Sequence, residues 1–421
     1  MMPGRAERRE GGVVLRFPRP LPKADNARES LTDPWVRAIL IVSCFALACV
    51  GLVMTFSAAS AIDMVNSKDM FATLRRQVLW TAVGLAAMWV VAQIDYRVLR
   101  RWAMPAVLLT YTLSAYAAAF GVERNGAKRW IDLKVFLLQP SELAKAACVL
   151  AVALVLANVR KSSEMRLRPL LPPLLVILAP FVVIVGHYQS DLGTTMSLAA
   201  AVFLLLILSK MLWRDIGTLM AVGVTGVIAL IAVAPYRLNR LLAYVDPWKY
   251  AESTGFQTIQ AWYAFGSGGI FGRGLGMSRQ KLFFLPFPQT DFIFAVIGEE
   301  LGLLGALTVV VLFGAAAYAG YRISAGASDR FGRLLAGGVT SLIIAQAAMN
   351  MAAATGLMPV TGIPLPFVSH GGSQMLLYMA CVGVLLSVHR YGGRADVAPV
   401  REGGRRVEGS GERRRNGGTR V

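Results

Sequence analysis

One carboxylate, Asp291, stands where a polar, glycine-rich stretch runs into an apolar one. The stretch reads GSGGIFGRGLGMSRQKLFFLPFPQTDFIFAVIGEE, from Gly266 to Glu300. A carboxylate at such a boundary can do chemistry on a substrate held in the membrane. Cations and flexible backbone before it suit the oxygens of a diphosphate, but no GK[ST] follows, which argues against a nucleotide loop. The candidates in this part are Arg273, Arg279, Gln280 and Lys281.

A second set of ionisable residues lies in NGAKRWIDLKVFLLQPSELAK, which ends at Lys145. Pro140 and Ser141 precede an apolar run and predict a helix start. Glu142 and Lys145 are three apart, so they share one face of that helix inside the membrane. Such a pair either faces a cavity as part of a site or neutralises itself and locks helices together. The candidates here are Lys128, Arg129, Glu142 and Lys145.

Two further segments carry polar residues next to turn-forming ones. Asp191, in QSDLGTT, is either a functional carboxylate or the cap of the following helix. The segment GLMPVTGIPLPFVSHGGSQM is so rich in proline and glycine that it predicts a shaped, re-entrant loop. A lone histidine in such a turn is more often structural than catalytic, although it can titrate near neutrality. The candidates in this loop are Ser369, His370 and Gly371.

Arg237 belongs to PYRLNRLLAYVDPWKY, where charged residues alternate with aromatic and aliphatic ones at helix-like spacing. The pattern predicts an amphipathic helix on the outer membrane interface. Glu299 and Glu300 follow Asp291 by eight and nine residues, or about 12 to 14 Å along one helix, too far to pair with it. They are either functional or packed against polar partners such as Lys145, Gln346 or Asn350.

Membrane-spanning helices must position these residues. A mean hydropathy of +0.55, with 56% hydrophobic and 16% charged residues, excludes a soluble domain of 421 residues. Lipid offers no partner to free backbone groups, so the spans must be helical. We therefore expect an all-α polytopic membrane protein with about ten transmembrane helices. The predicted spans lie near 36–57, 77–94, 102–121, 143–159, 169–187, 192–209, 215–235, 291–320, 334–354 and 373–389.

The net charge of +19 reflects topology rather than a nucleic-acid partner, because Lys and Arg fall mostly in alternate connections. By the positive-inside rule both termini are cytoplasmic, and a large loop at 236–290, between helices seven and eight, faces outward. Basic tails at 1–35 and 391–421 lack hydrophobic periodicity, so we expect them to be disordered on either side of a transmembrane domain at 36–390. The polar candidates then gather on the outer side.

From about Asp33 to Arg390 the chain resembles the SEDS family of bacterial cell-wall proteins, named for shape, elongation, division and sporulation. DPW and GLGMSRQK favour the FtsW branch, and PVTGIPLPF favours the RodA branch. Phe287 and Gln289 depart from the family, which commonly has Glu and His there, and His370 departs from its SYGG wording. The resemblance rests on NGAKRWI with QPSELAK, QSDLGT, VDPW, GFQTIQAWYAFGSGGIFGRGLGMSRQK, LPFPQTDFIFAVIGEELG, Gln346, Asn350 and PVTGIPLPFVSHGGSQ.

The resemblance implies a peptidoglycan glycosyltransferase that polymerises lipid II at the outer face of the bacterial cytoplasmic membrane, at the division septum. Asp291, in the family's TDFIF motif, would take the proton from the acceptor's 4-hydroxyl. A β-1,4 bond would form with inversion, and the diphosphate of the undecaprenyl-linked glycan would leave. A divalent cation, Mg²⁺ or Mn²⁺, is left open as a helper. The cations implied to stabilise the leaving group are Lys128, Arg129, Arg273, Arg279 and Lys281.

Implied partners are a class B penicillin-binding transpeptidase and other membrane proteins of the division complex. Three alternatives stay open: a lipid II flippase, a non-enzymatic scaffold of that complex, and a RodA-like side-wall enzyme. For Asp291 itself, a helix cap after Thr290 is the alternative to a base. A helix dipole would lower its pKa, whereas burial or a nearby carboxylate would raise it.

Overall fold

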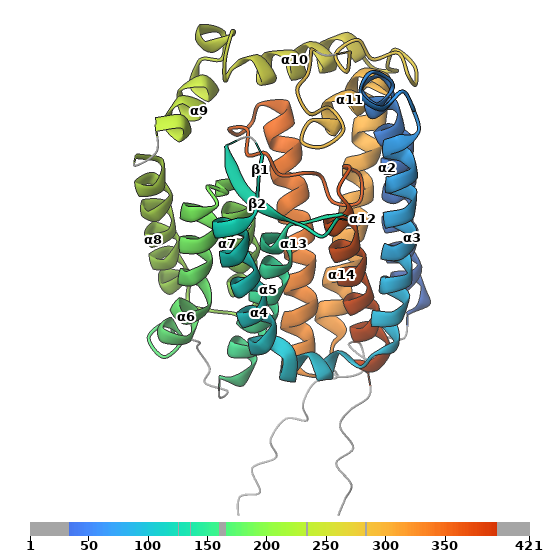
Figure 1. The fold of residues 1–421 in the computed structure, drawn as a ribbon. Helices are drawn as coiled ribbons and strands as arrows, with labels where there is room; N and C mark the ends of the chain where they lie inside the picture. The colour runs from blue at the N-terminus through green and yellow to red at the C-terminus, as the bar shows by residue number, and fades with distance from the viewer. Residues whose placement is uncertain are drawn as a thin grey trace, which may run out of the picture.

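The computed structural model describes residues 33–124, 126–134, 136–159, 166–232, 235–282 and 284–393. Within them the chain forms a bundle of long helices, with shorter helices and loops collected at one end (Figure 1). The predicted disorder of the tails falls on 1–32 and 394–421, which lie outside the described residues.

The first half of the chain begins with clear helix-start signals. Asp33 caps the first helix by accepting the Trp35 amide at 2.9 Å, and Pro34 occupies its first turn. Pro140 opens α5 in the same way. The elements are α2 (Pro34–Ser67), α3 (Ala72–Gln93), the short η1 (Tyr96–Val98), α4 (Leu99–Phe120), β1 (Val122–Arg124), β2 (Ala127–Asp132), β3 (Leu137–Leu138), α5 (Pro140–Asn158), α6 (Leu171–Phe181), η2 (Val182–Tyr188), α7 (Leu192–Leu208) and α8 (Trp213–Ala232).

The second half holds the predicted outer loop and the central helix of the bundle. Asp329 caps α13 through the Gly332 amide, and Gly356 ends it in the left-handed conformation that glycine favours. The elements are α9 (Pro235–Val245), η3 (Trp248–Tyr250), α10 (Phe256–Gly268), α11 (Ile293–Glu300), α12 (Gly302–Gly326), α13 (Arg330–Thr355) and α14 (Gly372–Tyr391).

The membrane-spanning helical fold is confirmed, although the count of ten spans stays a prediction. Among the described residues, seven helices are long and apolar enough to cross a membrane. The α3, α7 and α8 helices, which match three other predicted spans, run beside them (Figure 1). The seven are Pro34–Asn66, Tyr96–Phe120, Pro140–Asn158, Leu171–Tyr188, Gly302–Gly326, Arg330–Thr355 and Gly372–Tyr391.

The prediction of one continuous span at 291–320 is wrong. The chain makes the short α11, breaks at Leu301, and restarts as α12. Gly302 has φ +68°, and a β-carbon there would lie 2.3 Å from the Gly272 amide, so only glycine fits. The Arg273 and Gly274 amides donate to the last carbonyls of α11, both at 3.0 Å. The preceding loop therefore replaces the hydrogen bonds that the break removes.

A small sheet interrupts the otherwise helical fold and was not predicted. Its strands pair antiparallel in the order β1-β2-β3, with Ile131 opposite Leu138. Side chains alternate across a strand, so Lys128 is exposed while Arg129 is half-buried. Lys128 and Arg129 therefore lie on opposite faces of the sheet, and Arg129 is on the face toward the bundle.

The two ends of the bundle differ. The start of α2 and the end of α14 lie at one end, and α9, α10 and α11 lie at the other (Figure 1). We call these the inner and outer ends, following the predicted topology. Buried α13 contacts α5, α7 and α12 along the middle. At the inner end, Asp329 bonds both the Tyr96 hydroxyl and Arg100.

Candidate active site

Asp291 lies in the loop just before α11 and is half-buried. The N-cap of α11 is Phe292, and no side chain caps this helix. The helix-cap alternative for Asp291 is therefore wrong. Gly362 in the proline-rich loop faces the carboxyl so closely that a β-carbon there would lie 3.7 Å from Oδ2 of Asp291. The carboxyl group thus lies where two outer loops meet.

Three residues hold the backbone that leads into Asp291. The Asn350 side-chain amide donates to the Asp291 carbonyl at 2.9 Å. The Ser369 hydroxyl donates to the Thr290 carbonyl at 2.5 Å, and the His370 amide donates to the Gln289 carbonyl at 2.9 Å. Consecutive carbonyls are thereby fixed from α13 and from the loop at 356–371. Asn350, Ser369 and His370 position the Asp291 loop through its main chain.

The charges around Asp291 determine its proton affinity. Burial raises the pKa of its carboxyl from the ordinary 3.8 to about 6. Arg240 lowers that pKa, Asp191 raises it, and Arg129 lowers it. These residues come from α9, the start of α7 and β2, so the fold gathers charges from distant parts of the chain. A carboxyl group with this pKa is a stronger base than an exposed aspartate and is still ionised at pH 7.

Arg240 was missed as a candidate. The sequence signal was its position three residues after Arg237 in the amphipathic stretch, on the same helix face. The structure places both in α9, but the Arg237 side chain is outside the described residues. Tyr244 and Trp262 donate to the Leu357 and Thr355 carbonyls at 3.0 and 3.1 Å. The outer loop that carries Arg240 is therefore tied to the end of α13.

Arg129 and Asp191 meet at the start of α7. The Arg129 guanidinium donates to the Gln189 and Ser190 carbonyls at 2.9 and 2.7 Å, and it lies 4.0 Å from Oδ2 of Asp191. Asp191 also caps α7, because it accepts the Thr194 amide at 3.1 Å and the Thr194 hydroxyl at 2.8 Å. Asp191 is thus both a cap and the carboxylate that raises the pKa of Asp291.

Gly193 allows α7 to approach the proline-rich loop. A β-carbon at this position would lie 2.5 Å from the Thr361 carbonyl and 2.8 Å from Ile363. No other residue fits there without moving the loop. This contact brings the start of α7, with Asp191, against the loop that faces Asp291.

Glu142 and Lys145 lie deeper, in a buried network among α5, α13 and α14. Lys145 Nζ is 3.0 Å from Glu142 Oε1 and also bonds Gln346 Oε1, which accepts the Tyr378 hydroxyl at 2.6 Å. Gln346 in turn donates to the Pro364 carbonyl at 3.0 Å. Through this bond to Pro364, the network holds the loop at 356–371 against the helices. The other oxygen of Glu142, Oε2, finds no hydrogen-bond partner among the described residues.

The glycine-rich loop at 269–281 was expected to lie beside Asp291. It folds instead over the C-terminal end of α11, at Glu299 and Glu300. Glu300 accepts the Lys281 ammonium at 2.8 Å and the Ser57 hydroxyl at 2.7 Å. Glu299 accepts the Ser278 hydroxyl at 2.5 Å. The partners expected for the two glutamates, Lys145, Gln346 or Asn350, were wrong. Lys145 pairs with Glu142 and bonds Gln346, and Asn350 bonds the Asp291 carbonyl. The amides of Gly276, Ser278, Arg279 and Gln280 also donate to these carboxylates.

The predicted candidates therefore separate into two groups. Arg273 lies 3.7 Å from Glu299, at the opposite end of α11 from Asp291, and the Arg279 side chain is exposed. Lys128 is exposed on β2, and Gly371 precedes α14. His370 Nδ1 is 3.0 Å from Gln77 Oε1, and burial lowers the pKa of this imidazole, so His370 is neutral at pH 7. The residues that the structure brings around Asp291 are Arg129, Asp191, Asn350, Ser369 and His370.

A cavity of about 240 Å³ opens beside Arg240. Five of its eight lining residues carry a hydroxyl or amide group, and such groups suit sugar hydroxyls. It lies between α9, the residues that precede and begin α10, and the loop at 356–371. The lining residues are Arg240, Ala243, Tyr244, Ser253, Thr254, Gln257, Thr258 and Val360.

The carboxylates near Asp291 do not make up a metal site by themselves. The described residues contain no group of three His, Cys, Asp or Glu side chains that could hold a metal ion. Asp191, the carboxylate that acts on Asp291, already accepts hydrogen bonds from Thr194 and from Gln139. We therefore assign no step of the chemistry to a divalent cation.

Known proteins match this chain over most of its length. The chain is 37% identical over 355 residues to stage V sporulation protein E of Bacillus subtilis, a match that covers 84% of this chain and 96% of that protein. It is 39% identical over 353 residues to the probable peptidoglycan glycosyltransferase FtsW of Geobacter metallireducens, covering 83% and 93% of the two chains.

Solved structures share the fold. A chain from a study of how a peptidoglycan synthase complex coordinates polymerization and crosslinking superposes with a TM-score of 0.68 at 27% identity, covering 83% of this chain and 96% of that one. The rod shape determining protein RodA of Thermus thermophilus superposes with a TM-score of 0.61 at 26% identity, covering 85% and 97%. The family described as cell cycle proteins, with FtsW, RodA and SpoVE as members, matches residues 37–393. This chain therefore belongs to the FtsW, RodA and SpoVE family, the SEDS family that its motifs indicated.

Proposed function

We propose that this chain is a peptidoglycan glycosyltransferase that polymerises lipid II into β-1,4 glycan strands at the outer face of the cytoplasmic membrane. The names of its FtsW relatives support this enzyme class. The gathering of Asp291, Arg129 and Arg240 at the outer end of the bundle supports the site. The substrate is carried on a lipid diphosphate, so a cationic site at the end of a membrane bundle suits it.

Asp291 is the general base of this reaction, and its raised pKa is the observation that carries the assignment. A half-buried carboxyl with a pKa of about 6 can take a proton from a sugar hydroxyl and is still ionised at neutral pH. General base catalysis of this kind typically contributes about 10²- to 10⁴-fold. The main-chain bonds from Asn350 and Ser369 leave the carboxyl group free to face the substrate.

The reaction is a single displacement. The acceptor's 4-hydroxyl oxygen forms the new bond to the anomeric carbon of the growing chain as Asp291 takes its proton. The bond from that carbon to the diphosphate oxygen breaks, and its electron pair leaves with the diphosphate. Arg240 and Arg129 lie close enough to Asp291 to act on its pKa, and they stabilise the charge that develops on the leaving group.

The cavity of about 240 Å³ beside Arg240 receives a sugar ring of the substrate. Its hydroxyl and amide lining offers the hydrogen bonds that orient such a ring. Orientation of this kind supplies much of the rate that a displacement reaction needs. A class B penicillin-binding transpeptidase is the partner that would crosslink the product, and the division septum is the proposed location. The names of its FtsW relatives support the division branch.

Purified protein in sealed proteoliposomes, supplied with lipid II and a class B transpeptidase, tests this function. We expect glycan polymer with the unaltered chain and none above background with Asp291→Asn. The matched control, Glu252→Gln, removes an exposed carboxylate from the same outer loop and should keep full activity. Polymer formation that survives Asp291→Asn would exclude Asp291 as the base. Lipid transfer between leaflets without polymer would favour the flippase, and neither activity would favour the scaffold.

A further inference from the structure

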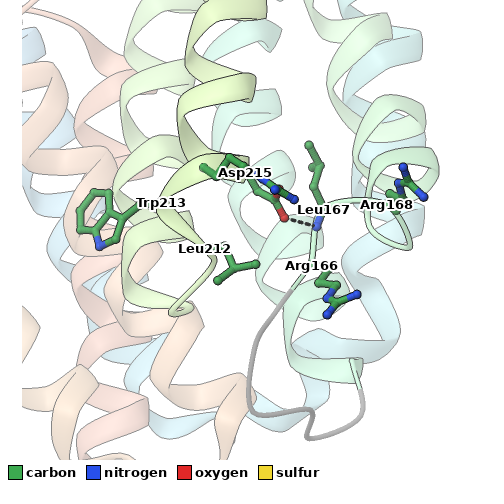
Figure 2. A pocket seen from close by; sticks show the side chains of 7 residues that line it. Arg166, Leu167, Arg168, Leu212, Trp213 and Asp215 are labelled. Carbon is green, nitrogen blue, oxygen red and sulfur yellow. Dashed lines mark hydrogen bonds between the residues drawn. The ribbon is translucent and has the colours of Figure 1, made fainter.

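A second, larger cavity lies at the inner end of the bundle, opposite Asp291. It has a volume of about 770 Å³ and is formed where the residues before α6 lie against the start of α8 (Figure 2). This volume is within the range of known ligand sites, about 300 to 1,000 Å³. The lining residues are Arg166, Leu167, Arg168, Leu212, Trp213, Arg214 and Asp215.

Three of the lining side chains are arginines, against one carboxylate. Arg166, Arg168 and Arg214 are exposed, and among the described residues no carboxylate lies within ion-pair distance of them. In the described part of the chain, Asp215 lines the same cavity but forms no ion pair with these arginines, and its Oδ2 accepts the Leu167 amide at 2.7 Å. Figure 2 shows this bond joining the two walls. Asp215 thus holds the cavity together and leaves its cations available.

Other arginines at the inner end behave differently. Arg100 pairs with Asp329, and Arg330 donates to the Val159 carbonyl at 2.7 Å. Arg390 bonds the Gln93 side chain. These three therefore hold the bundle together. The arginines of the cavity have no such structural partner among the described residues, and a bound anion would supply one.

The apolar part of the lining indicates that the anion belongs to a lipid. Leu167 and Leu212 line the cavity beside the arginines, and Trp213, at the start of α8, is 71% exposed. A tryptophan at a helix end is typical of headgroup level at a membrane interface. Basic pockets between helices on the cytoplasmic side bind anionic headgroups. A free phosphate would use the arginines but not these apolar groups.

We propose that this cavity binds the phosphate of an anionic phospholipid headgroup, such as that of phosphatidylglycerol, from the inner leaflet. The phosphate lies between the arginines, and the glycerol and first acyl carbons lie along Leu167, Leu212 and Trp213. The site is independent of the proposed transferase chemistry, since it is at the other end of the bundle. It is on α8, which leads toward α9 and Arg240.

Native mass spectrometry of the full chain, released from phosphatidylcholine nanodiscs that contain phosphatidylglycerol, tests the proposal. The triple variant Arg166→Gln, Arg168→Gln, Arg214→Gln removes the cavity's cations. The matched control removes three exposed inner-end arginines outside it, with Arg37→Gln, Arg101→Gln and Arg322→Gln. We expect bound phosphatidylglycerol to weaken by about fivefold for each cavity arginine removed. The control should bind as the unaltered chain does.

Equal loss in both triple variants would overturn the proposal, because the lipid would then respond to total surface charge. Inorganic phosphate at millimolar concentration, added to pure phosphatidylcholine nanodiscs, distinguishes the source of the anion. Binding of that phosphate with the same arginine dependence, and no retention of phosphatidylglycerol, would overturn the lipid assignment. If the triple variant fails to fold, the three single variants replace it, and each must lose affinity by about fivefold.

Discussion

The side-chain amide of Asn350 holds the main-chain carbonyl of Asp291 at 2.9 Å. The same amide nitrogen reaches the Ile363 carbonyl at 2.7 Å. One residue of the central helix thus joins the loop that carries the proposed base to the proline-rich loop that faces it. The carboxyl group takes no part in these bonds. They fix the main chain of Asp291 without occupying its carboxyl oxygens.

Asn350→Ala should therefore lower kcat by about tenfold or more while KM changes little, because the base moves but the binding groups stay. Two buried carbonyls lose their donor, which should cost about 1 to 3 kcal/mol of stability. Steady-state polymerisation kinetics and thermal melting measure the two effects. Thr355→Ala removes a hydroxyl that bonds only within the same helix and should change neither kinetic constant. An unchanged kcat in Asn350→Ala would contradict the positioning role.

The pH dependence of polymerisation should report the pKa of Asp291. The active form of a general base is deprotonated, so kcat/KM should rise with pH and level off above about 6. Below that value it should fall by about tenfold per pH unit. Initial rates with lipid II between pH 4.5 and 8 measure the profile. A kcat/KM that stays level down to pH 4.5, as expected for an aspartate with the ordinary pKa of 3.8, would contradict the effect of burial.

The position of that bend should move in opposite directions when neighbouring charges are removed. Asp191 raises the pKa of Asp291 and Arg240 lowers it. Asp191→Asn should therefore move the bend to lower pH, and Arg240→Gln should move it to higher pH. Arg279→Gln, which changes an exposed arginine at the other end of α11, serves as control and should leave the bend in place. Shifts of the same sign in the two variants would contradict the assigned environment.

Asp291→Asn should make the protein more stable at pH 8 while it abolishes activity. The folded pKa of this carboxyl lies above its unfolded value, so its charge opposes folding above about pH 6 and has no effect below about 4. A two-unit shift corresponds to about 3 kcal/mol, which partial exposure reduces to about 1 kcal/mol. Thermal melting at pH 8 and at pH 4 measures the difference. Equal gains at both values would mean that the charge is not the cause.

Lys281→Met should destabilise the fold rather than impair the chemistry. Lys281 and Glu300 are buried and lie 2.8 Å apart, so removing one partner leaves an unpaired buried charge and costs about 3 to 5 kcal/mol. Adding Glu300→Gln should restore part of that loss, which chemical denaturation of the single and double variants would measure. If Lys281→Met melts like the unaltered chain but loses activity, Lys281 has a direct role with substrate.

Much of the site could be predicted because its residues stand at helix ends and in loops rich in proline and glycine. Asp291, Arg129, Asp191 and the 356–371 loop were found in this way, and the structure brings them together. The cations at Arg273 and Lys281 were misplaced for a physical reason. Arg273 and Lys281 precede Asp291 by 18 and ten residues, so they could reach its carboxyl group only if the loop folded back toward it. The loop instead folds over Glu299 and Glu300, beside the break at Gly302.

The sequence by itself determined that this chain crosses a membrane as helices and presents its polar motifs at one end. Both conclusions follow from local quantities, the length of apolar runs and the placement of Lys and Arg. Only the tertiary structure decided which charges act on Asp291. Arg240, Asp191 and Arg129 reach it from three separate elements, and Asn350 from a fourth. Such partners are selected by the packing of helices far apart in the chain, which no local pattern records.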